Sequence, residues 1–209
     1  MSVEKMPCLL AKYLLAFIVA GLFLAGCEDP RLEHLPSNAR ILAFGDSLTE
    51  GYGVGKEDNY PNILSEITGF TVVNAGVSGE VTAQGARRFS EVLGSNDADL
   101  VILLEGGNDI LRNHDAADTK RNLALMIEMA QVRDIPVILI GVPEKKFFSD
   151  AAPFYGELAE EYHLVYEDEI IASLLRSPDL KSDSVHFNEK GYRALAVRIK
   201  KLLSESGAL

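Results

Sequence analysis

The sequence predicts an α/β fold in which helices cover both faces of a mainly five-stranded parallel sheet. Short apolar runs alternate along the chain with segments whose apolar residues recur at helical spacing. These runs contain few polar residues, which is typical of strands buried on both faces in a parallel sheet. We expect the strands at Arg40–Phe44, Phe70–Val73, Leu100–Leu104, Pro136–Ile140 and Leu164–Tyr166.

Helices are expected between and after these strands. They cover Tyr60–Ile67, Val81–Leu93, residues 118–132, Pro153–Tyr162 and Asn188–Leu203. The last has the clearest pattern, because its apolar residues lie along one face. Asn188 precedes the first periodic residue and is of a type that caps a helix N-terminus.

The first 26 residues differ from the rest of the chain. Lys5 and Lys12 lie near the start, and an apolar run from Tyr13 to Leu24 follows them. A run of this length is short for a membrane span, which needs roughly 20 residues, and fits a secretory signal. The run ends in Leu24-Ala25-Gly26-Cys27, which resembles the bacterial lipoprotein signal. That resemblance implies cleavage before Cys27, acyl chains on its sulfur and a place in the bacterial cell envelope. The alternative is an uncleaved N-terminal anchor.

Composition limits the remaining organisation. We expect a signal peptide at residues 1–26 and a tether at 27–38, where two prolines and mixed charges lie. The rest, 39–209, is expected to form a single domain, because 47% of the chain is hydrophobic and 24% is charged. The net charge of −11 argues against nucleic acid or another polyanion as a partner. Cys8 would leave with the signal and Cys27 would be acylated, so we expect no disulfide and no cysteine metal site. We expect a monomer.

Candidate functional residues follow the predicted strands. Ser47 comes after the first strand, Gly76 after the second and Asn108 after the third. Asp183 and His186 lie in a loop before the last helix. Because sites in open α/β sheets lie outside the carboxyl ends of the strands, these groups are expected to face one crevice.

Each motif also has a simpler explanation when it is taken alone. The turn at Gly45-Asp46-Ser47 also fits a phosphate-binding turn, although no P-loop lysine follows. Asp183 could cap the final helix beside an incidental histidine. The glycines around Gly76 and Asn108 could form ordinary turns. All four motifs together favour acyl transfer, in which a serine attacks, a histidine takes its proton and an aspartate orients the histidine.

The order of these motifs resembles that of the GDSL, or SGNH, hydrolase family. Gly45-Asp46-Ser47-Leu48 matches the first block, Gly76 the second and Gly106-Gly107-Asn108-Asp109 the third. Asp183-Ser184-Val185-His186 matches the last block. The resemblance extends from about Arg40 to Leu203 and is closest to small bacterial arylesterases and thioesterase/lysophospholipases. It implies a three-layer α/β/α, flavodoxin-like sandwich.

The resemblance also implies the roles of these residues. Ser47, Asp183 and His186 would form the catalytic triad, and Ser47, Gly76 and Asn108 would form the oxyanion hole. No metal or organic cofactor is expected. Phe187 departs from the family pattern, because many members have a proline after the histidine, which affects loop stiffness rather than chemistry.

The substrate is left open by the sequence. Aryl esters, short or medium acyl esters, lysophospholipids and acyl thioesters all suit this mechanism. Residues 144–148 combine basic and aromatic groups, so this loop either contacts substrate or is solvated with two phenylalanines packed inward. His114 is a candidate for the rim of the site. A carbohydrate O-acetylesterase and a non-catalytic lipid- or glycan-binding lipoprotein are the alternatives.

Overall fold

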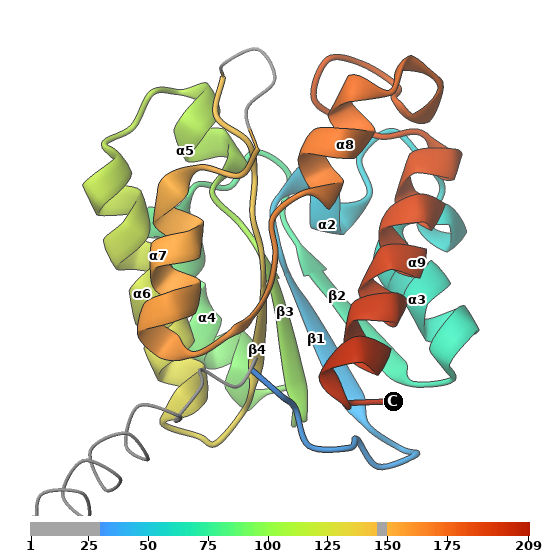
Figure 1. Ribbon diagram of the computed structural model, residues 1–209, viewed down its shortest axis with the longest axis vertical. Coiled ribbons are helices and arrows are strands. Elements are labelled where there is room, and N and C mark those ends of the chain that lie inside the picture. Colours follow the sequence, from blue (N-terminus) through green and yellow to red (C-terminus); the bar gives the residue numbers. More distant parts are fainter. Residues whose placement is uncertain (1–29, 146–149) are drawn as a thin grey trace, which may run out of the picture.

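The computed structural model describes residues 30–145 and 150–209, and it contains a five-stranded parallel sheet with the strand order β2-β1-β3-β4-β5 (Figure 1). This order is that of flavodoxin-like sheets. The predicted α/β fold is therefore confirmed. The strands are β1 (Arg40–Gly45), β2 (Thr71–Gly76), β3 (Leu100–Leu104), β4 (Val137–Ile140) and β5 (Val165–Glu167).

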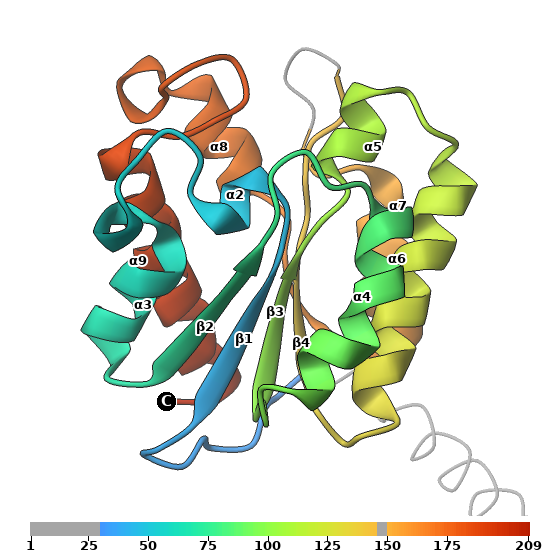
Figure 2. The same cartoon turned by 180° about the vertical axis from the view of Figure 1, so that it is seen from behind.

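Longer helices form a layer on each face of the sheet (Figure 2). On one face lie α3 (Tyr60–Thr68) and α9 (Glu189–Ser206). On the other lie α4 (Thr82–Gly94), α6 (Ala116–Gln131) and α7 (Pro153–Tyr162). The central strand β3 is fully buried between these layers, as its uninterrupted apolar sequence predicts. Asn188 caps α9 as expected, because its side chain accepts a hydrogen bond from the Gly191 N–H at 3.1 Å.

Short helices that the sequence analysis did not predict lie where the strands end. They are α2 (Ser47–Glu50), α5 (Gly107–Leu111) and α8 (Ile170–Arg176), with 3₁₀ turns η1 (Lys56–Asp58) and η2 (Pro178–Leu180). In Figure 1, α2, α5 and α8 gather at the upper end of the molecule, beyond the carboxyl ends of the strands. Each is too short to show a helical period in its sequence.

Strand β2 extends three residues beyond the expected end at Val73. Its ladder with β1 continues through Asn74 and Ala75 to the pair Gly45 and Gly76. Asn74-Ala75-Gly76 has the composition of a turn, so composition alone ended the strand too early. Gly76 therefore lies inside the sheet and not in the loop that follows it.

The start of the described chain packs against the end of the last helix. The Leu32 N–H donates to the Ser206 carbonyl at 2.9 Å, and the Leu35 N–H donates to the Ala208 carbonyl at 3.0 Å. Leu35 is buried. Residues 32–35, which were expected in a tether at 27–38, are thus held on the domain.

The predicted signal peptide and Cys27 lie outside the described residues. Within the described ranges, no helix has the length and apolar character that crossing a bilayer requires.

Candidate active site

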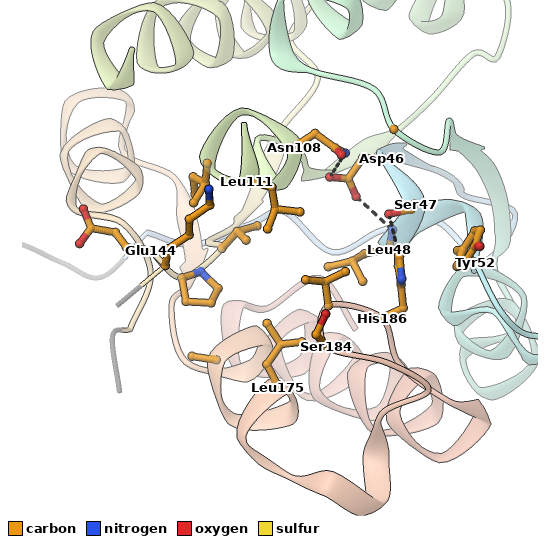
Figure 3. A pocket seen from close by; sticks show the side chains of 18 of the residues that line it. Asp46, Ser47, Leu48, Tyr52, Asn108, Leu111, Glu144, Leu175, Ser184 and His186 are labelled. Atoms are coloured by element: carbon orange, nitrogen blue, oxygen red, sulfur yellow. Dashed lines mark hydrogen bonds between the residues drawn. The ribbon is translucent and has the colours of Figure 1, made fainter. Parts of the chain in front are cut away.

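Ser47 is the first residue of α2, directly after β1. The turn is tight because β1 and β3 are close there: a Cβ on Gly45 would lie 1.9 Å from the Leu104 carbonyl oxygen. The Asp46 side chain caps α2 by accepting the Leu48 N–H at 3.0 Å. These contacts fix Ser47 at the floor of a pocket, between Asp46 and His186 (Figure 3).

The structure brings Ser47, His186 and Asp183 into one hydrogen-bonded chain. His186 Nε2 lies 3.1 Å from Ser47 Oγ, and His186 Nδ1 lies 2.7 Å from Asp183 Oδ2. The second Asp183 oxygen accepts the backbone N–H groups of Val185 and His186, both at 2.8 Å. The loop therefore holds the carboxylate and the imidazole in a fixed relative orientation. This is the arrangement in which a histidine can take a serine proton.

Asp183 stays ionised in this setting. Partial burial alone would raise its pKa, but the hydrogen bonds from the His186 ring and from the Val185 and His186 N–H groups outweigh it. The pKa of Asp183 is therefore lowered. An ionised Asp183 requires a proton on Nδ1, which leaves Nε2 free to accept the proton of Ser47.

Asn108 lies on α5 and reaches the same pocket. Its Nδ2 donates to Asp46 Oδ2 at 3.2 Å, as the dashed line in Figure 3 shows. Close approach is possible because residue 107 is a glycine: a Cβ there would lie 3.0 Å from the same Asp46 oxygen. The predicted grouping of Ser47 with Asn108 is therefore present.

Gly76 does not occupy the position expected of it. Its N–H donates to Asn74 Oδ1 at 2.9 Å, so this donor is already engaged. A Cβ at this residue would come within 2.0 Å of the Glu50 backbone nitrogen, so close packing of β2 against α2 explains the glycine. Gly79, three residues later, lines the pocket and has a φ of 78°. The sequence analysis assigned no role to Gly79. Because β2 extends through Gly76, Gly79 and not Gly76 lies in the loop after the strand.

The pocket has a volume of about 770 Å³. Much of its wall is apolar and comes from α5 and α8; Figure 3 shows Leu111 and Leu175 on opposite sides of it. Lys145 and Arg176 supply positive charge to the lining. Lys145 donates to Asn113 at 2.9 Å, and Arg176 lies 3.6 Å from Asp150. Sequence reasoning missed the α8 wall because the helix itself was not expected.

Tyr52 is a second contact that the sequence analysis missed. Its ring centroid lies 4.4 Å from that of His186, with the two planes 35° apart. Tyr52 is 52% exposed, so it covers one face of the imidazole from the solvent side. No motif around Tyr52 distinguishes it from a solvated loop residue.

Two expectations about the rim have different outcomes. His114 does not line this pocket; it lies in a smaller one, where Nδ1 is 3.4 Å from Asp109 Oδ1. Glu144 and Lys145 of the basic and aromatic loop do line the main pocket. The remainder of that loop, residues 146–148, falls outside the described ranges.

Three more carboxylates lie buried close to the site. They are Asp46, Glu105 and Asp109. Burial raises the pKa of Asp46 to about 6, although the Leu48 N–H, His186 and Asn108 all act to lower it. Burial also raises the pKa of Glu105 well above its ordinary value, and neither of its oxygens has a hydrogen-bond partner among the described residues. Over the same ranges, no group of acidic, histidine or cysteine side chains is arranged to hold a metal ion.

Comparison with known proteins agrees with this geometry. The model of the GDSL-like lipase/acylhydrolase family matches residues 43–194, which include every residue of the hydrogen-bonded chain. The chain belongs to this family. It is therefore an esterase of the GDSL/SGNH type.

Named relatives fall within the same group of enzymes. An arylesterase of Vibrio mimicus is 28% identical over 161 residues, which cover 72% of this chain and 80% of the relative. The thioesterase 1/protease 1/lysophospholipase L1 of Escherichia coli strain K12 is 25% identical over 156 residues, covering 71% and 75%. Among solved structures, the SGNH-hydrolase family esterase AlinE4 is 33% identical with a TM-score of 0.64, covering 82% of this chain and 98% of AlinE4.

Proposed function

We propose that this esterase hydrolyses carboxylic esters through an acyl-enzyme on Ser47. The observation that carries the proposal is the 3.1 Å contact between Ser47 Oγ and His186 Nε2 inside a pocket with a largely apolar wall. His186 removes the Ser47 proton as Oγ attacks the ester carbonyl, and it then donates that proton to the departing alcohol. Asp183 keeps the ring in the required tautomer. Water, activated by the same histidine, then releases the acid.

The negative charge on the carbonyl oxygen needs nearby donors. We assign this role to the Ser47 N–H, the Gly79 N–H and the Asn108 side-chain amide. Neither the Ser47 N–H nor the Gly79 N–H donates to any described residue, so both are free for substrate. Gly79 here replaces Gly76, whose N–H is taken by Asn74. Loss of one such donor lowers kcat about 10²–10³-fold in other enzymes.

The apolar wall supports aryl or medium-chain acyl esters, and lysophospholipids and acyl thioesters suit the same steps. An enzyme restricted to acetyl groups would need a shorter pocket. We expect kcat/KM for the 4-nitrophenyl ester of octanoate to equal or exceed that for acetate. A clear preference for acetate would favour a carbohydrate O-acetylesterase instead.

Ser47→Ala tests the nucleophile. We expect hydrolysis of 4-nitrophenyl octanoate to fall by at least 10³-fold, because only the oxyanion donors and substrate binding then remain. Ser184→Ala is the matched control, since Ser184 lines the same pocket but makes no hydrogen bond to His186. A fluorophosphonate probe should label Ser47 alone on peptide mapping. Retention of more than a few per cent of turnover by Ser47→Ala would exclude the assignment.

We further propose that Cys27 carries acyl chains that hold the enzyme on a membrane of the bacterial envelope. The support is the Leu24-Ala25-Gly26-Cys27 sequence after an apolar run. Metabolic labelling with a fatty-acid analogue should mark the wild type and not Cys27→Ser. An unlabelled wild type in a bacterial host would leave a secreted or N-terminally anchored esterase.

A further inference from the structure

Asp46 connects α2, which begins with Ser47, to α5, which carries Asn108. Its Oδ1 accepts the Leu48 N–H of α2 at 3.0 Å, and its Oδ2 accepts Asn108 Nδ2 of α5 at 3.2 Å. Only 4% of the residue is exposed, so solvent offers these donors no ready alternative. The sequence motif assigned no role to this carboxylate.

An ionised Asp46 determines which end of the Asn108 amide faces it. The two ends of an amide have nearly the same shape, so hydrogen bonding decides their orientation. A carboxylate can only accept, whereas the amide oxygen can only accept and the amide nitrogen can only donate. The nitrogen must therefore face Asp46, and one of its two N–H groups remains for the pocket.

Protonation of Asp46 removes this selection. A neutral carboxyl group can donate to the Asn108 oxygen, so the flipped amide becomes acceptable and its donor turns away from the substrate. Burial is the main reason why this proton is taken up near pH 6, and Asp109 adds to the effect while His186 opposes it. Other titratable groups face the same carboxylate from the surrounding elements: Glu105 after β3, Tyr60 of α3, Tyr155 of α7 and Tyr192 of α9.

We propose that Asp46 is a positioning residue whose ionised carboxylate holds the Asn108 amide in the orientation that stabilises the oxyanion. This inference rests on the proposed function, in which Asn108 is an oxyanion donor. Among the described residues the Asp46 carboxylate accepts hydrogen bonds from Leu48 and Asn108 and none from the Ser47 hydroxyl, so we assign it a role through Asn108.

A double-mutant cycle separates this role from a structural one. Asp46→Asn should lower kcat for 4-nitrophenyl octanoate about 10–100-fold with little change in KM, because oxyanion stabilisation belongs to the transition state. In the Asn108→Ala background, Asp46→Asn should have no further effect on kcat, since the amide it positions is gone. Glu105→Gln is the matched control: it replaces a buried carboxyl group that makes no hydrogen bond to Asn108 with an amide of the same shape, so kcat at pH 8 should be unchanged.

The pH profile gives a second readout that does not depend on the Asp46 variant folding. The acid limb of log kcat/KM should be steeper for the wild type than for Asn108→Ala, by about one proton, because protonation of Asp46 lowers activity only where there is an amide to orient. Asp183 does not contribute there, since its pKa is lowered.

Specific results would overturn the proposal. These are equal losses of kcat from Asp46→Asn in the wild-type and Asn108→Ala backgrounds, a kcat of Asp46→Asn within twofold of wild type, or identical acid limbs in wild type and Asn108→Ala. Failure of the proposed function itself looks different: Ser47→Ala would then retain turnover and the fluorophosphonate would label another residue.

Discussion

Asp183 and Asp46 each orient one side chain of the active site, but their surroundings have opposite effects on their charge. The Asp183 side chain is 46% exposed and receives three donors, one of them from the imidazole, so its pKa falls. Asp46 is almost fully buried and receives two neutral donors, so its pKa rises. At Asp183 the three hydrogen bonds together outweigh the effect of partial burial, whereas at Asp46 the two donors do not offset nearly complete burial. Asp183, the more exposed carboxylate, therefore stays ionised to a lower pH than Asp46 does.

Glu105 is a third carboxyl group in this comparison, with complete burial and no hydrogen-bond donor within the described ranges. It is fully buried directly after β3, and no described residue donates to its oxygens. The Tyr155 hydroxyl lies close but donates to the Glu105 backbone carbonyl, at 2.8 Å. With burial unopposed by donors, the pKa of Glu105 rises well above its ordinary value.

The largest expected effect comes from exchanging the charged partner of His186 for a neutral one. Asp183→Asn keeps the shape but places a donor opposite Nδ1, which forces the proton onto Nε2. That tautomer cannot accept the Ser47 proton, so kcat should fall about 10⁴-fold near neutral pH. Steady-state kinetics with 4-nitrophenyl octanoate measures this loss, and circular dichroism confirms the fold. A loss of tenfold or less would mean that Asp183 does not set the tautomer.

A smaller effect, on stability and not on turnover, is expected at Glu105. Glu105→Met removes a polar group buried without donors, and we expect it to raise the free energy of unfolding at pH 8 by about 1–3 kcal/mol. The gain should shrink as the pH falls toward 5. A raised folded pKa means that the native state keeps a proton that the unfolded chain releases, so wild-type stability declines as pH rises above the unfolded value. Urea unfolding at pH 5 and pH 8 measures both quantities, and a gain independent of pH would contradict a raised pKa of Glu105.

The smallest effect sharpens the contrast between exposed and buried carboxylates. Because the folded pKa of Asp183 is depressed, its contribution to stability is complete above the unfolded value and is lost only as the pH falls through the folded one. The difference in unfolding free energy between wild type and Asp183→Asn should therefore stay constant between pH 5 and pH 8. Its exposure keeps that difference small. A difference in unfolding free energy that changes between pH 5 and pH 8 would show that Asp183 titrates in the same range as the buried Asp46.

The sequence was sufficient for the parts of the site that depend on one motif each. Ser47, His186 and Asp183 each sit beside a recognisable strand end or helix start, and the rule for parallel sheets places such loops at one edge. Features set by packing between distant segments were not predictable. Which of Gly76 and Gly79 lies in the loop depends on where β2 ends. That end is set by pairing with β1 rather than by local composition. Helix α8 has too few residues to show a period, so the wall containing Leu175 had no signal.

Helix α9 spans the distance between the active site and the point where the start of the described chain packs on the domain. It starts three residues after His186, and its last residue, Ser206, accepts the hydrogen bond from Leu32. Its 18 residues rise about 27 Å. The five Cα steps from Cys27 to Leu32 span at most about 18 Å.

A lipid on Cys27 would therefore hold the domain by the end opposite its pocket. The connecting segment, at most about 18 Å long, is shorter than the rise of about 27 Å along α9. We expect so short a segment to keep the pocket away from the bilayer that holds the anchor. Esters dissolved in the surrounding water, or carried on a facing surface, would reach Ser47 more readily than lipids of the anchoring leaflet. Inserting about 20 Gly and Ser residues before Leu32 should raise turnover of an ester embedded in that bilayer and leave turnover of a soluble ester unchanged. Equal rates on the embedded ester with and without the insert would show that the length of this segment does not limit access of the pocket to the anchoring bilayer.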